Sequence, residues 1–377
     1  MRGEDGSPAR VLHVFSNFVP SGPEIRTVRL IAAFGSEFRH SIVSMDGRTE
    51  AAALLPAGVD VRLLPHPPKA GSLSTARRLR RLLLSERPDL VLTYNWGAFD
   101  MLLAARAAGF RRLVHHEEGF NEDEAESYKR RRVLARRLIL PGAHRIVVPS
   151  QRLREIATGL WRLDSERVRL IPNGIHLEAF QRADGNPGLR RRLGIPVDAL
   201  VVGTVGGLRP VKNQLRLLDA CAAAGPGVHA LLVGEGDERP ALEARAERDD
   251  LRGRVHLAGH QADPAPYLQA MDVFALTSDS EQMPVCLLEA MASSLPVVAT
   301  DVGDVRAVLP PEQAAFLEPP GPDAAAGLAR GIAGLTRDPG LRQRLGTANR
   351  RRAEERFTFD GMCAAYREVY LSALGAG

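Results

Sequence analysis

One stretch, Met271 to Gly303, decides the fold of this chain: MDVFALTSDSEQMPVCLLEAMASSLPVVATDVG. Val273–Thr277 is a short apolar run typical of a buried strand. Ser278–Ser280 offers turn and N-cap side chains, and Pro284 suits the first position of a helix. A second buried strand begins at Val297–Ala299. The stretch therefore predicts a strand, loop, helix and parallel strand joined by a right-handed crossover.

Two carboxylates bracket the start of the predicted helix. Glu281 lies in the loop, and Glu289 lies within the helix, less than two turns from its start. Helix N-terminal amides and the helix dipole favour a bound diphosphate at such a loop. Acidic side chains beside an anion need another partner, and sugar or ribose hydroxyls are suitable donors. A solvated loop acid and an exposed helix residue are the alternative interpretation.

Length and composition describe an ordinary globular chain. At 377 residues, two domains are expected. Met1–Ala9 has no apolar segment behind it that would suggest a signal peptide, and no run has the length of a membrane span. The three cysteines (Cys221, Cys286 and Cys363) are far apart, which favours core thiols in a reducing cytoplasm over disulfides or zinc ligands.

Apolar strand-like runs alternate with helical patterns through the first half of the chain, beginning at Arg10–Phe15. This alternation predicts an α/β fold with doubly wound parallel sheets and ligands at the carboxyl ends of the strands. A boundary is expected after residue 172, followed by a polar connector at Asp184–Pro187. The predicted domains are residues 1–172 and 173–359, with a last helix at 360–377 packing back on the first.

The second predicted domain opens on Leu200–Val205, a strand that runs into Gly206 and Gly207. Arg209 and Lys212 then precede another helix. A glycine turn followed by cations before a helix suits a diphosphate. The sequence therefore predicts a second anion-binding loop.

These motifs together resemble the family 4 retaining glycosyltransferases of the GT-B fold. The family signature S-x-x-E-G-x-P-x-x-x-L-E-A-M-A-x-G-x-P-V-V-A-T matches residues 278–300 closely. The family patterns V-G-R-L-x-P-x-K-N and I-P-N-G-V-D resemble residues 205–213 and 171–176. The resemblance covers Arg10 to about Leu374. It implies two Rossmann-like domains that face each other across a cleft, with the acceptor on the first and the nucleotide sugar on the second.

The resemblance also implies roles for residues at the matching positions. Lys212 corresponds to the phosphate-binding lysine, Glu281 to the residue that holds donor-sugar hydroxyls, and Glu289 to the one that holds the ribose. Gln261 would contact the nucleobase through main-chain atoms. The remaining donor-binding candidates are Gly22, Arg209, Gln282, Met283 and Pro284, of which the last two were expected to contribute amides.

Three departures accompany the resemblance. The family's loop arginine is Gly207 here, and Arg209 is the candidate that replaces it. Gln282 stands where glycine is usual after the first glutamate, so donor geometry and sugar identity are open. The family's acceptor-side histidine is displaced: His116 is the first candidate, with Glu118 and His115 as rivals. Surface imidazoles beside an acidic loop that runs through Glu126 are the alternative interpretation.

The implied reaction is transfer of a sugar from a UDP- or GDP-linked donor to an acceptor hydroxyl with retained configuration, without a metal. The expected acceptor is lipid-linked or a glycan, in cell-envelope or exopolysaccharide synthesis, and no nucleic-acid partner is expected. A nucleotide-sugar epimerase and a non-catalytic sugar-binding protein are the alternatives. Conversion of a single nucleotide sugar to its isomer would distinguish the epimerase.

Cations are concentrated in the first predicted domain. Lys and Arg outnumber Asp and Glu by nine among residues 1–172. Two clusters stand out: Arg77, Arg78, Arg80 and Arg81, and then Arg130, Arg131, Arg132, Arg136 and Arg137. They predict a salt-sensitive, peripheral attachment to an anionic membrane surface, with solvated helix faces as the alternative.

Overall fold

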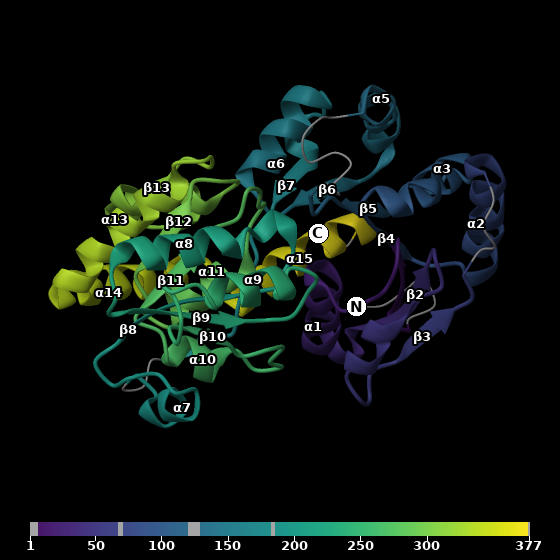
Figure 1. The fold of residues 1–377 in the computed structure, drawn as a ribbon. Helices are drawn as coiled ribbons and strands as arrows, with labels where there is room; N and C mark the ends of the chain where they lie inside the picture. Colours follow the sequence, from purple (N-terminus) through teal and green to yellow (C-terminus); the bar gives the residue numbers. More distant parts are fainter. Residues whose placement is uncertain (1–6, 67–70, 120–128, 182–184, 376–377) are drawn as a thin grey trace. The chain divides into compact units, whose positions relative to one another are not determined.

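The computed structural model describes residues 7–66, 71–119, 129–181 and 185–375. The chain divides into two compact units, the first made of Met1–Pro172 with Met362–Gly377 and the second of Asn173–Gly361. Each unit contains one fully parallel sheet (Figure 1). The connector predicted at Asp184–Pro187 and the acidic loop through Glu126 lie partly or wholly outside the described residues.

The first unit contains a seven-stranded sheet in the order β3-β2-β1-β4-β5-β6-β7. Its strands are apolar along most of their length because helices cover both faces. The strands are β1 (Ala9–Phe15), β2 (Phe38–Ser44), β3 (Val61–Leu64), β4 (Leu90–Tyr94), β5 (Leu113–His116), β6 (Arg145–Val148) and β7 (Val168–Leu170). The helices are α1 (Gly22–Phe34), α2 (Ser72–Glu86), α3 (Phe99–Ala107), α5 (Arg130–Ile139), α6 (Gln151–Glu155) and, from Met362 onward, α15 (Phe359–Leu374).

The two faces of this sheet differ in chemistry. One face packs aliphatic side chains such as Leu12 and Val91 against α2, α3 and α5. The other face carries rings, among them Tyr94 and His116, which stack with centroids 4.6 Å apart. Tyr370 of α15 reaches this ring layer. The polar and aromatic layer therefore lies under the last helix.

The second unit contains a six-stranded sheet in the order β10-β9-β8-β11-β12-β13. The strands are β8 (Leu200–Val205), β9 (Val228–Val233), β10 (Val255–Leu257), β11 (Val273–Leu276), β12 (Val297–Thr300) and β13 (Leu317–Glu318). The helices are α7 (Pro187–Arg192), α8 (Gln214–Ala224), α9 (Arg239–Ala246), α10 (Ala265–Gln269), α11 (Val285–Ala292), α12 (Val305–Val308), α13 (Ala324–Arg337) and α14 (Pro339–Arg356). Separate apolar cores fill the two faces.

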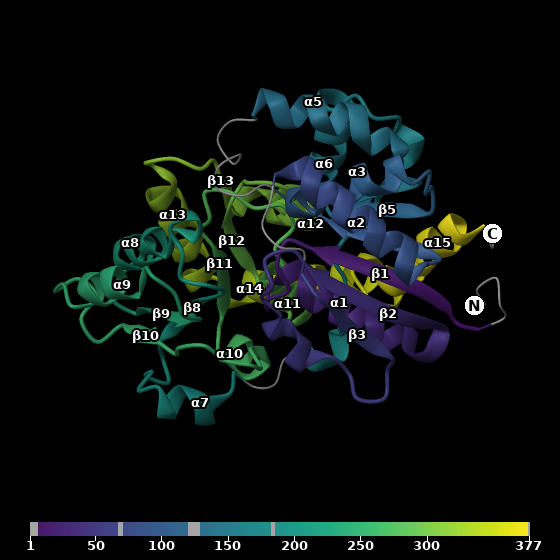
Figure 2. The same ribbon diagram turned by 90° about the vertical axis from the view of Figure 1, so that its right-hand side faces the viewer.

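The strand order places a topological switch point in each sheet. In the second unit β8 and β11 are paired neighbours, as Figures 1 and 2 show, and the chain leaves them toward opposite edges. In the first unit β1 and β4 have the same relationship. Ligands of open α/β sheets bind outside the carboxyl ends of such strands. The loops after these four strands are therefore the places to search for a site.

Two local predictions in the deciding stretch were wrong. Pro284 occupies the N-cap of α11 rather than its first turn, and no side chain caps that helix. The hydroxyl of Ser278 instead donates to Glu281, because the loop turns back on itself before the helix begins. Among the described residues, no helix is both long and apolar enough to cross a membrane.

Candidate functional site

The switch point of the second unit brings two predicted site residues together. Lys212 follows β8 and Glu281 follows β11, and their Nζ and Oε1 atoms lie 2.5 Å apart. The lysine side chain is 19% exposed and the glutamate side chain 9%. The hydroxyl of Ser278 donates to the same carboxylate oxygen over 2.7 Å. A partly buried ion pair of this kind holds both charges at a defined place.

Main-chain hydrogen bonds tie the two loops into one surface. The amide of Asp279 donates to the carbonyl of Val211 over 2.8 Å. The Thr277 hydroxyl donates to the carbonyl of Lys212 over 3.2 Å, and the Thr300 hydroxyl donates to the carbonyl of Ser278 over 2.6 Å. The loop backbones are thus held before any ligand arrives, which favours electrostatic preorganisation.

Gly303 determines how closely the chain passes behind Glu281. Its φ is +55°, in the left-handed region, and a Cβ atom there would lie 2.1 Å from the Glu281 carbonyl oxygen. Any larger residue would push the glutamate loop outward or strain the backbone. Sequence analysis assigned no role to this glycine, although it lies inside the recognised stretch.

Glu289 lies in α11 and is half-buried. Cys286 lies one turn earlier in the same helix, and burial raises the pKa of its thiol to about 12. The charge of Lys212 opposes that rise in pKa, while the carboxylates of Glu281 and Glu289 add to it. The side chains of Lys212, Glu281 and Glu289 therefore lie near this thiol, which stays protonated at neutral pH.

The loop between Glu281 and α11 is anchored through its carbonyl groups. The Gln282 carbonyl accepts a hydrogen bond from the Asp304 amide, and the Met283 carbonyl accepts one from the Asn173 side chain over 3.0 Å. Gln282 has no positive φ, so the backbone here does not require the usual glycine. The expected amide contribution of Pro284 was wrong, because proline has no N–H.

Arg209 lies beside the position left open by Gly207. An ideal Cβ built on Gly207 would have the Arg209 Nε as its nearest neighbour, at 3.5 Å. This is ordinary contact distance, so the arginine side chain passes next to the place where a residue-207 side chain would start. Arg209 is exposed. The Arg209 side chain thus occupies the space beside residue 207.

Gln261 follows β10 in the second unit, and Gly22 follows β1 in the first. The Gln261 side-chain amide folds back and donates to the Ala258 carbonyl over 2.7 Å. Gly22 begins α1 in the first unit, and no described atom lies within 4 Å of a Cβ built there. A larger side chain at residue 22 would therefore clash with no described atom.

His116 occupies the ring layer of the first unit and has no exposed surface. Its Nδ1 lies 3.2 Å from the Thr93 carbonyl and its Nε2 lies 3.3 Å from the Tyr370 hydroxyl. Burial, followed by the nearby charge of Arg26, lowers its pKa well below the ordinary value. The structure thus places His116 as a neutral, fully bonded ring and not on an accessible surface.

His115 points to the opposite face of the sheet. Its Nδ1 lies 2.9 Å from the Thr93 hydroxyl, and its Nε2 lies 3.6 Å from the Glu117 carboxylate. Burial alone would raise the pKa of Glu117, but the His115 contact and the charge of Arg136 lower it on balance. The alternative interpretation, a pair of surface imidazoles, was therefore wrong: strand β5 continues through both histidines and buries them.

Glu118 is held by Arg26, which sequence analysis did not single out. The two groups form a two-pronged ion pair, with Nη1 to Oε2 at 2.8 Å, and both side chains are 8% exposed. Glu24 lies in the same region: burial raises its pKa, and the Ser21 hydroxyl donates to its carboxylate. The loops after β1 and β5 and the start of α1 thus gather one cation and two carboxyl groups.

Within the described parts of the chain, no three His, Cys, Asp or Glu side chains are grouped so that they could hold a metal ion.

Gly97 adds a close contact at the switch point of the first unit, where a Cβ would lie 1.8 Å from the Ser16 hydroxyl oxygen. The loops after β1 and β4 therefore touch, and only glycine permits this.

Comparison with known families explains this arrangement. Residues 186–352 match the family model described as "Glycosyl transferases group 1", and residues 21–174 match "Glycosyl transferase 4-like domain". The chain belongs to the family 4, group 1 glycosyltransferases. The residues around Lys212 and Glu281 lie in the part of this glycosyltransferase that matches the group 1 model. Those around Glu118 lie in the part that matches the 4-like domain.

Named relatives agree with this assignment. The glycosyltransferase is similar to the putative glycosyltransferase EpsF of Bacillus subtilis, with 28% identity over 311 residues that cover 79% of this chain and 80% of EpsF. It is also similar to a D-inositol 3-phosphate glycosyltransferase of Streptomyces bingchenggensis, with 30% identity over 64% of this chain. That match spans only 56% of the Streptomyces protein.

Solved structures agree on the fold of the glycosyltransferase. The crystal structure of Anabaena Alr3699/HepE in complex with UDP aligns with a TM-score of 0.84 at 22% identity, covering 96% of this chain and all of that one. WaaG, a glycosyltransferase involved in lipopolysaccharide biosynthesis, aligns with a TM-score of 0.68 at 17% identity, covering 95% and 99%. The fold is GT-B.

Proposed function

We propose that this glycosyltransferase moves a sugar from a nucleoside-diphosphate sugar, linked to UDP or GDP, to an acceptor hydroxyl with retention of configuration. The observation that carries the proposal is the partly buried pair of Lys212 and Glu281 at the switch point of the second sheet. A cation beside a carboxylate suits a donor that is anionic at the diphosphate and rich in hydroxyl groups at the sugar.

In the proposed reaction the diphosphate leaves as negative charge develops on it. Lys212, Arg209 and the main-chain amides that follow Glu281 would stabilise that charge, usually the largest single contribution to catalysis. Glu281 would accept hydrogen bonds from donor-sugar hydroxyls and Glu289 from the ribose. The leaving phosphate oxygen would take the acceptor proton, so the proposal needs no separate strong base and no metal.

The proposed acceptor is lipid-linked or a glycan of the cell envelope. Supporting this, the chain is 30% identical over 252 residues to an Escherichia coli protein named UDP-Gal:alpha-D-GlcNAc-diphosphoundecaprenol alpha-1,3-galactosyltransferase. It is 32% identical over 183 residues to a lipopolysaccharide core biosynthesis glycosyltransferase of Rhizobium meliloti. We further propose that the protein works in the cytoplasm, with its first unit at an anionic membrane surface.

The test incubates the purified protein with a panel of UDP- and GDP-sugars, with and without lipid-linked acceptors, and follows the products by mass spectrometry. A product that contains donor sugar and acceptor, with the donor's anomeric configuration by NMR, is expected. An isomerised nucleotide sugar formed without acceptor would replace the proposal with an epimerase. An inverted linkage would contradict the retaining mechanism.

A further inference from the structure

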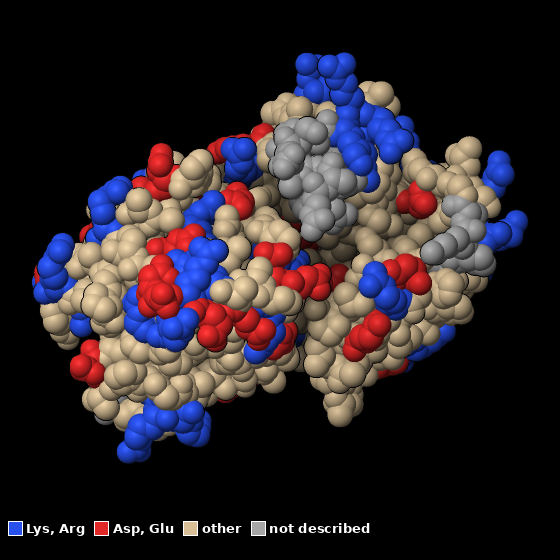
Figure 3. Space-filling view, in the orientation of Figure 1, with Lys and Arg blue, Asp and Glu red and all other residues tan. Residues whose placement is uncertain are grey.

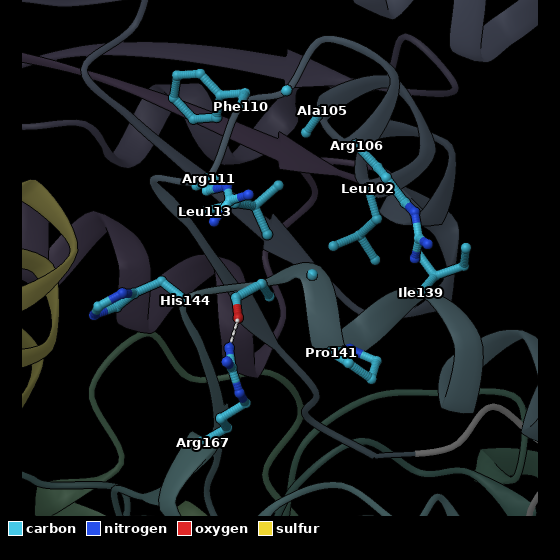
Figure 4. Close-up of a pocket in the computed structure, with 13 residues that line it drawn as sticks. Leu102, Ala105, Arg106, Phe110, Arg111, Leu113, Ile139, Pro141, His144 and Arg167 are labelled. Atoms are coloured by element: carbon cyan, nitrogen blue, oxygen red, sulfur yellow. Dashed lines mark hydrogen bonds between the residues drawn. The ribbon is translucent and has the colours of Figure 1, made fainter.

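A pocket of about 570 Å³ opens in the first unit, on the sheet edge opposite the loops described above (Figure 4). It is lined where the chain enters β5, β6 and β7: by Arg111 and Leu113, by His144, and by Arg167. Glu118 and Ser150, in contrast, follow the carboxyl ends of β5 and β6. The pocket is therefore separate from the candidate transfer site.

One side of this pocket is cationic. Figure 4 shows Arg111 and Arg167 on this side, with the Arg167 guanidinium donating to the Ala143 carbonyl over 3.1 Å. The His144 ring turns away from the two arginines, and its Nε2 lies 2.6 Å from the Ser372 hydroxyl of α15. Within the described residues, neither Arg106, Arg111 nor Arg167 forms an ion pair, and the lining contains no acidic residue. Burial, with the charges of Arg145 and Arg167, lowers the pKa of His144, as a positive local potential should. A hollow lined by one sign of charge concentrates the opposite sign.

The other side of the pocket is mainly apolar and carries one cation, Arg106, whose guanidinium donates to the Leu138 carbonyl over 2.8 Å. Figure 4 places Leu102, Ile139 and Pro141 together across from Arg167. Leu102 is 4% exposed and Leu113 only 2%, so the pocket floor belongs to the core of the unit. The volume lies within the range of about 300–1,000 Å³ typical of small-molecule sites. A ligand that fills it would cover apolar surface with one part and meet arginines with another.

We propose that this pocket binds one anionic amphiphile, a hydrocarbon chain that ends in a phosphate or a carboxylate. An inorganic anion would leave the Leu102 side uncovered, and a neutral chain would leave the arginines without a counter-charge. Helix α5, which ends at the pocket with Ile139, also exposes Leu134 to 55% and Leu138 to 60%. Exposed apolar side chains on that helix would let the hydrocarbon chain of the ligand enter from a lipid or detergent environment.

Binding is tested on the full-length protein by calorimetry with four probes, each kept below its micelle-forming concentration. The probes are dodecyl phosphate, dodecanoate, dodecyl maltoside and inorganic phosphate. The two anionic amphiphiles are expected to bind at least tenfold more tightly than the neutral one and than phosphate alone. Comparison of the first two identifies the preferred anionic group.

Two variants test the location. Gly142 lines the pocket mouth, and a Cβ there meets nothing within 4 Å and needs no positive φ, so Gly142→Glu adds a negative charge without a clash. Gly159→Glu is the matched control, because Gly159 has equal space in the same unit but does not line the pocket. Arg111→Ala with Arg167→Ala removes the two cations, and Arg154→Ala is its exposed control.

Both pocket variants should weaken binding of dodecyl phosphate about tenfold or more, since each charge-assisted contact is worth that factor. The two controls should bind as the wild type does, and all variants should bind UDP unchanged. Equal affinity for dodecyl maltoside, equal affinity for inorganic phosphate, or unchanged binding by both pocket variants would overturn the proposal. Because UDP binding is measured separately, such a failure leaves the proposed transferase function untouched.

Discussion

The ammonium group of Lys212 lies 2.5 Å from the Glu281 carboxylate, although 69 residues separate the two in the chain. Each group neutralises the other while no donor is present. A diphosphate would compete with Glu281 for the lysine, and the released carboxylate could then accept hydrogen bonds from sugar hydroxyls. The pair is therefore consistent with both proposed roles.

Removal of either member of this pair should abolish most transfer. Lys212→Ala and Glu281→Gln should each lower kcat/KM by about tenfold to a hundredfold, because each loses a charge-assisted hydrogen bond worth about 1.5–3 kcal/mol. Glu289→Ala should behave in the same way if it holds the ribose. Circular dichroism and thermal unfolding check that the variants fold.

Asp279→Asn is the control for these variants. Asp279 lies in the same loop as Glu281, but it pairs with Arg216 and its side chain is 46% exposed. Its loss should leave kcat/KM within about twofold, as expected for a surface ion pair. Wild-type turnover in folded Lys212→Ala and Glu281→Gln variants would remove both residues from the site.

Arg209 should carry the phosphate contact that the family assigns to residue 207. Arg209→Ala should weaken UDP or GDP binding by about tenfold. Gly207→Arg should keep or strengthen it, since the nearest atom to its Cβ is 3.5 Å away. Isothermal calorimetry on the free nucleotides measures both. Equal affinity of Arg209→Ala and wild type would show that Arg209 is only a surface cation.

The ion pair of Arg26 and Glu118 should support the fold of the first unit as well as the site. Arg26→Met should lower the free energy of unfolding by about 3–5 kcal/mol, because it leaves a carboxylate buried without its cation. The double variant Arg26→Met with Glu118→Met should recover much of that loss. Urea unfolding measures the free energy of unfolding of the wild type, the single variant and the double variant. A double variant as unstable as the single one would show that no such coupling exists.

The buried histidines should make the first unit sensitive to acid. Burial lowers the pKa of His13 and His116 well below its ordinary value and that of His40 to about 4. Since the unfolded chain takes up protons near pH 6.5 and the folded chain does not, stability is fully present above that pH. At lower pH the free energy of unfolding should decrease, by about 1.4 kcal/mol per pH unit for each buried ring.

His40→Phe tests this acid sensitivity. The phenyl ring fills a similar buried space and takes up no proton. The slope of the free energy of unfolding against pH, between about pH 6 and pH 5, should therefore decrease by about 1.4 kcal/mol per pH unit, which corresponds to one proton. Denaturant titrations at several pH values supply the slope. The same slope in the variant and the wild type would mean that His40 is protonated in the folded state.

Attachment to an anionic membrane surface should depend on α2 and the exposed part of α5. Figure 3 shows Lys and Arg side chains gathered over α5, of which Arg130 and Arg131 are exposed. Arg136 does not belong to this surface, contrary to the sequence interpretation: it is 1% exposed and pairs with Glu117. Its ring contacts with Trp96 and Trp161 explain the burial of a cation there.

Co-sedimentation with liposomes tests this attachment. The exposed quartet Arg77, Arg78, Arg80 and Arg81 should contribute about 1 kcal/mol per residue at low salt, so a quadruple Ala variant should lose most of its binding to anionic vesicles. The control removes four exposed arginines of the second unit: Arg191, Arg192, Arg248 and Arg252. Equal pelleting with neutral and anionic vesicles would contradict an electrostatic attachment.

Local sequence determined the elements and the type of loop between them. The apolar runs at Val273–Leu276 and Val297–Thr300 became neighbouring strands, and the helix between them lies where its pattern predicts. Lys212, Glu281 and Glu289 were singled out because each lies in a short motif that resembles a family pattern. Such features depend on side-chain periodicity and turn chemistry, which a few adjacent residues contain.

Only the tertiary structure decided which residues meet and which are accessible. Lys212 approaches Glu281 because β8 pairs with β11, and strand order is a long-range property that no local pattern contains. The same holds for His116, the first acceptor-side candidate, which lies under Tyr370, 254 positions later. Sequence analysis assigned no role to Arg26 and placed Arg136 in a surface cluster, whereas the roles of both arise from carboxylates that the folded chain buries beside them. Burial and pairing of charges depend on the whole sheet, because desolvation is set by all the elements that cover a group.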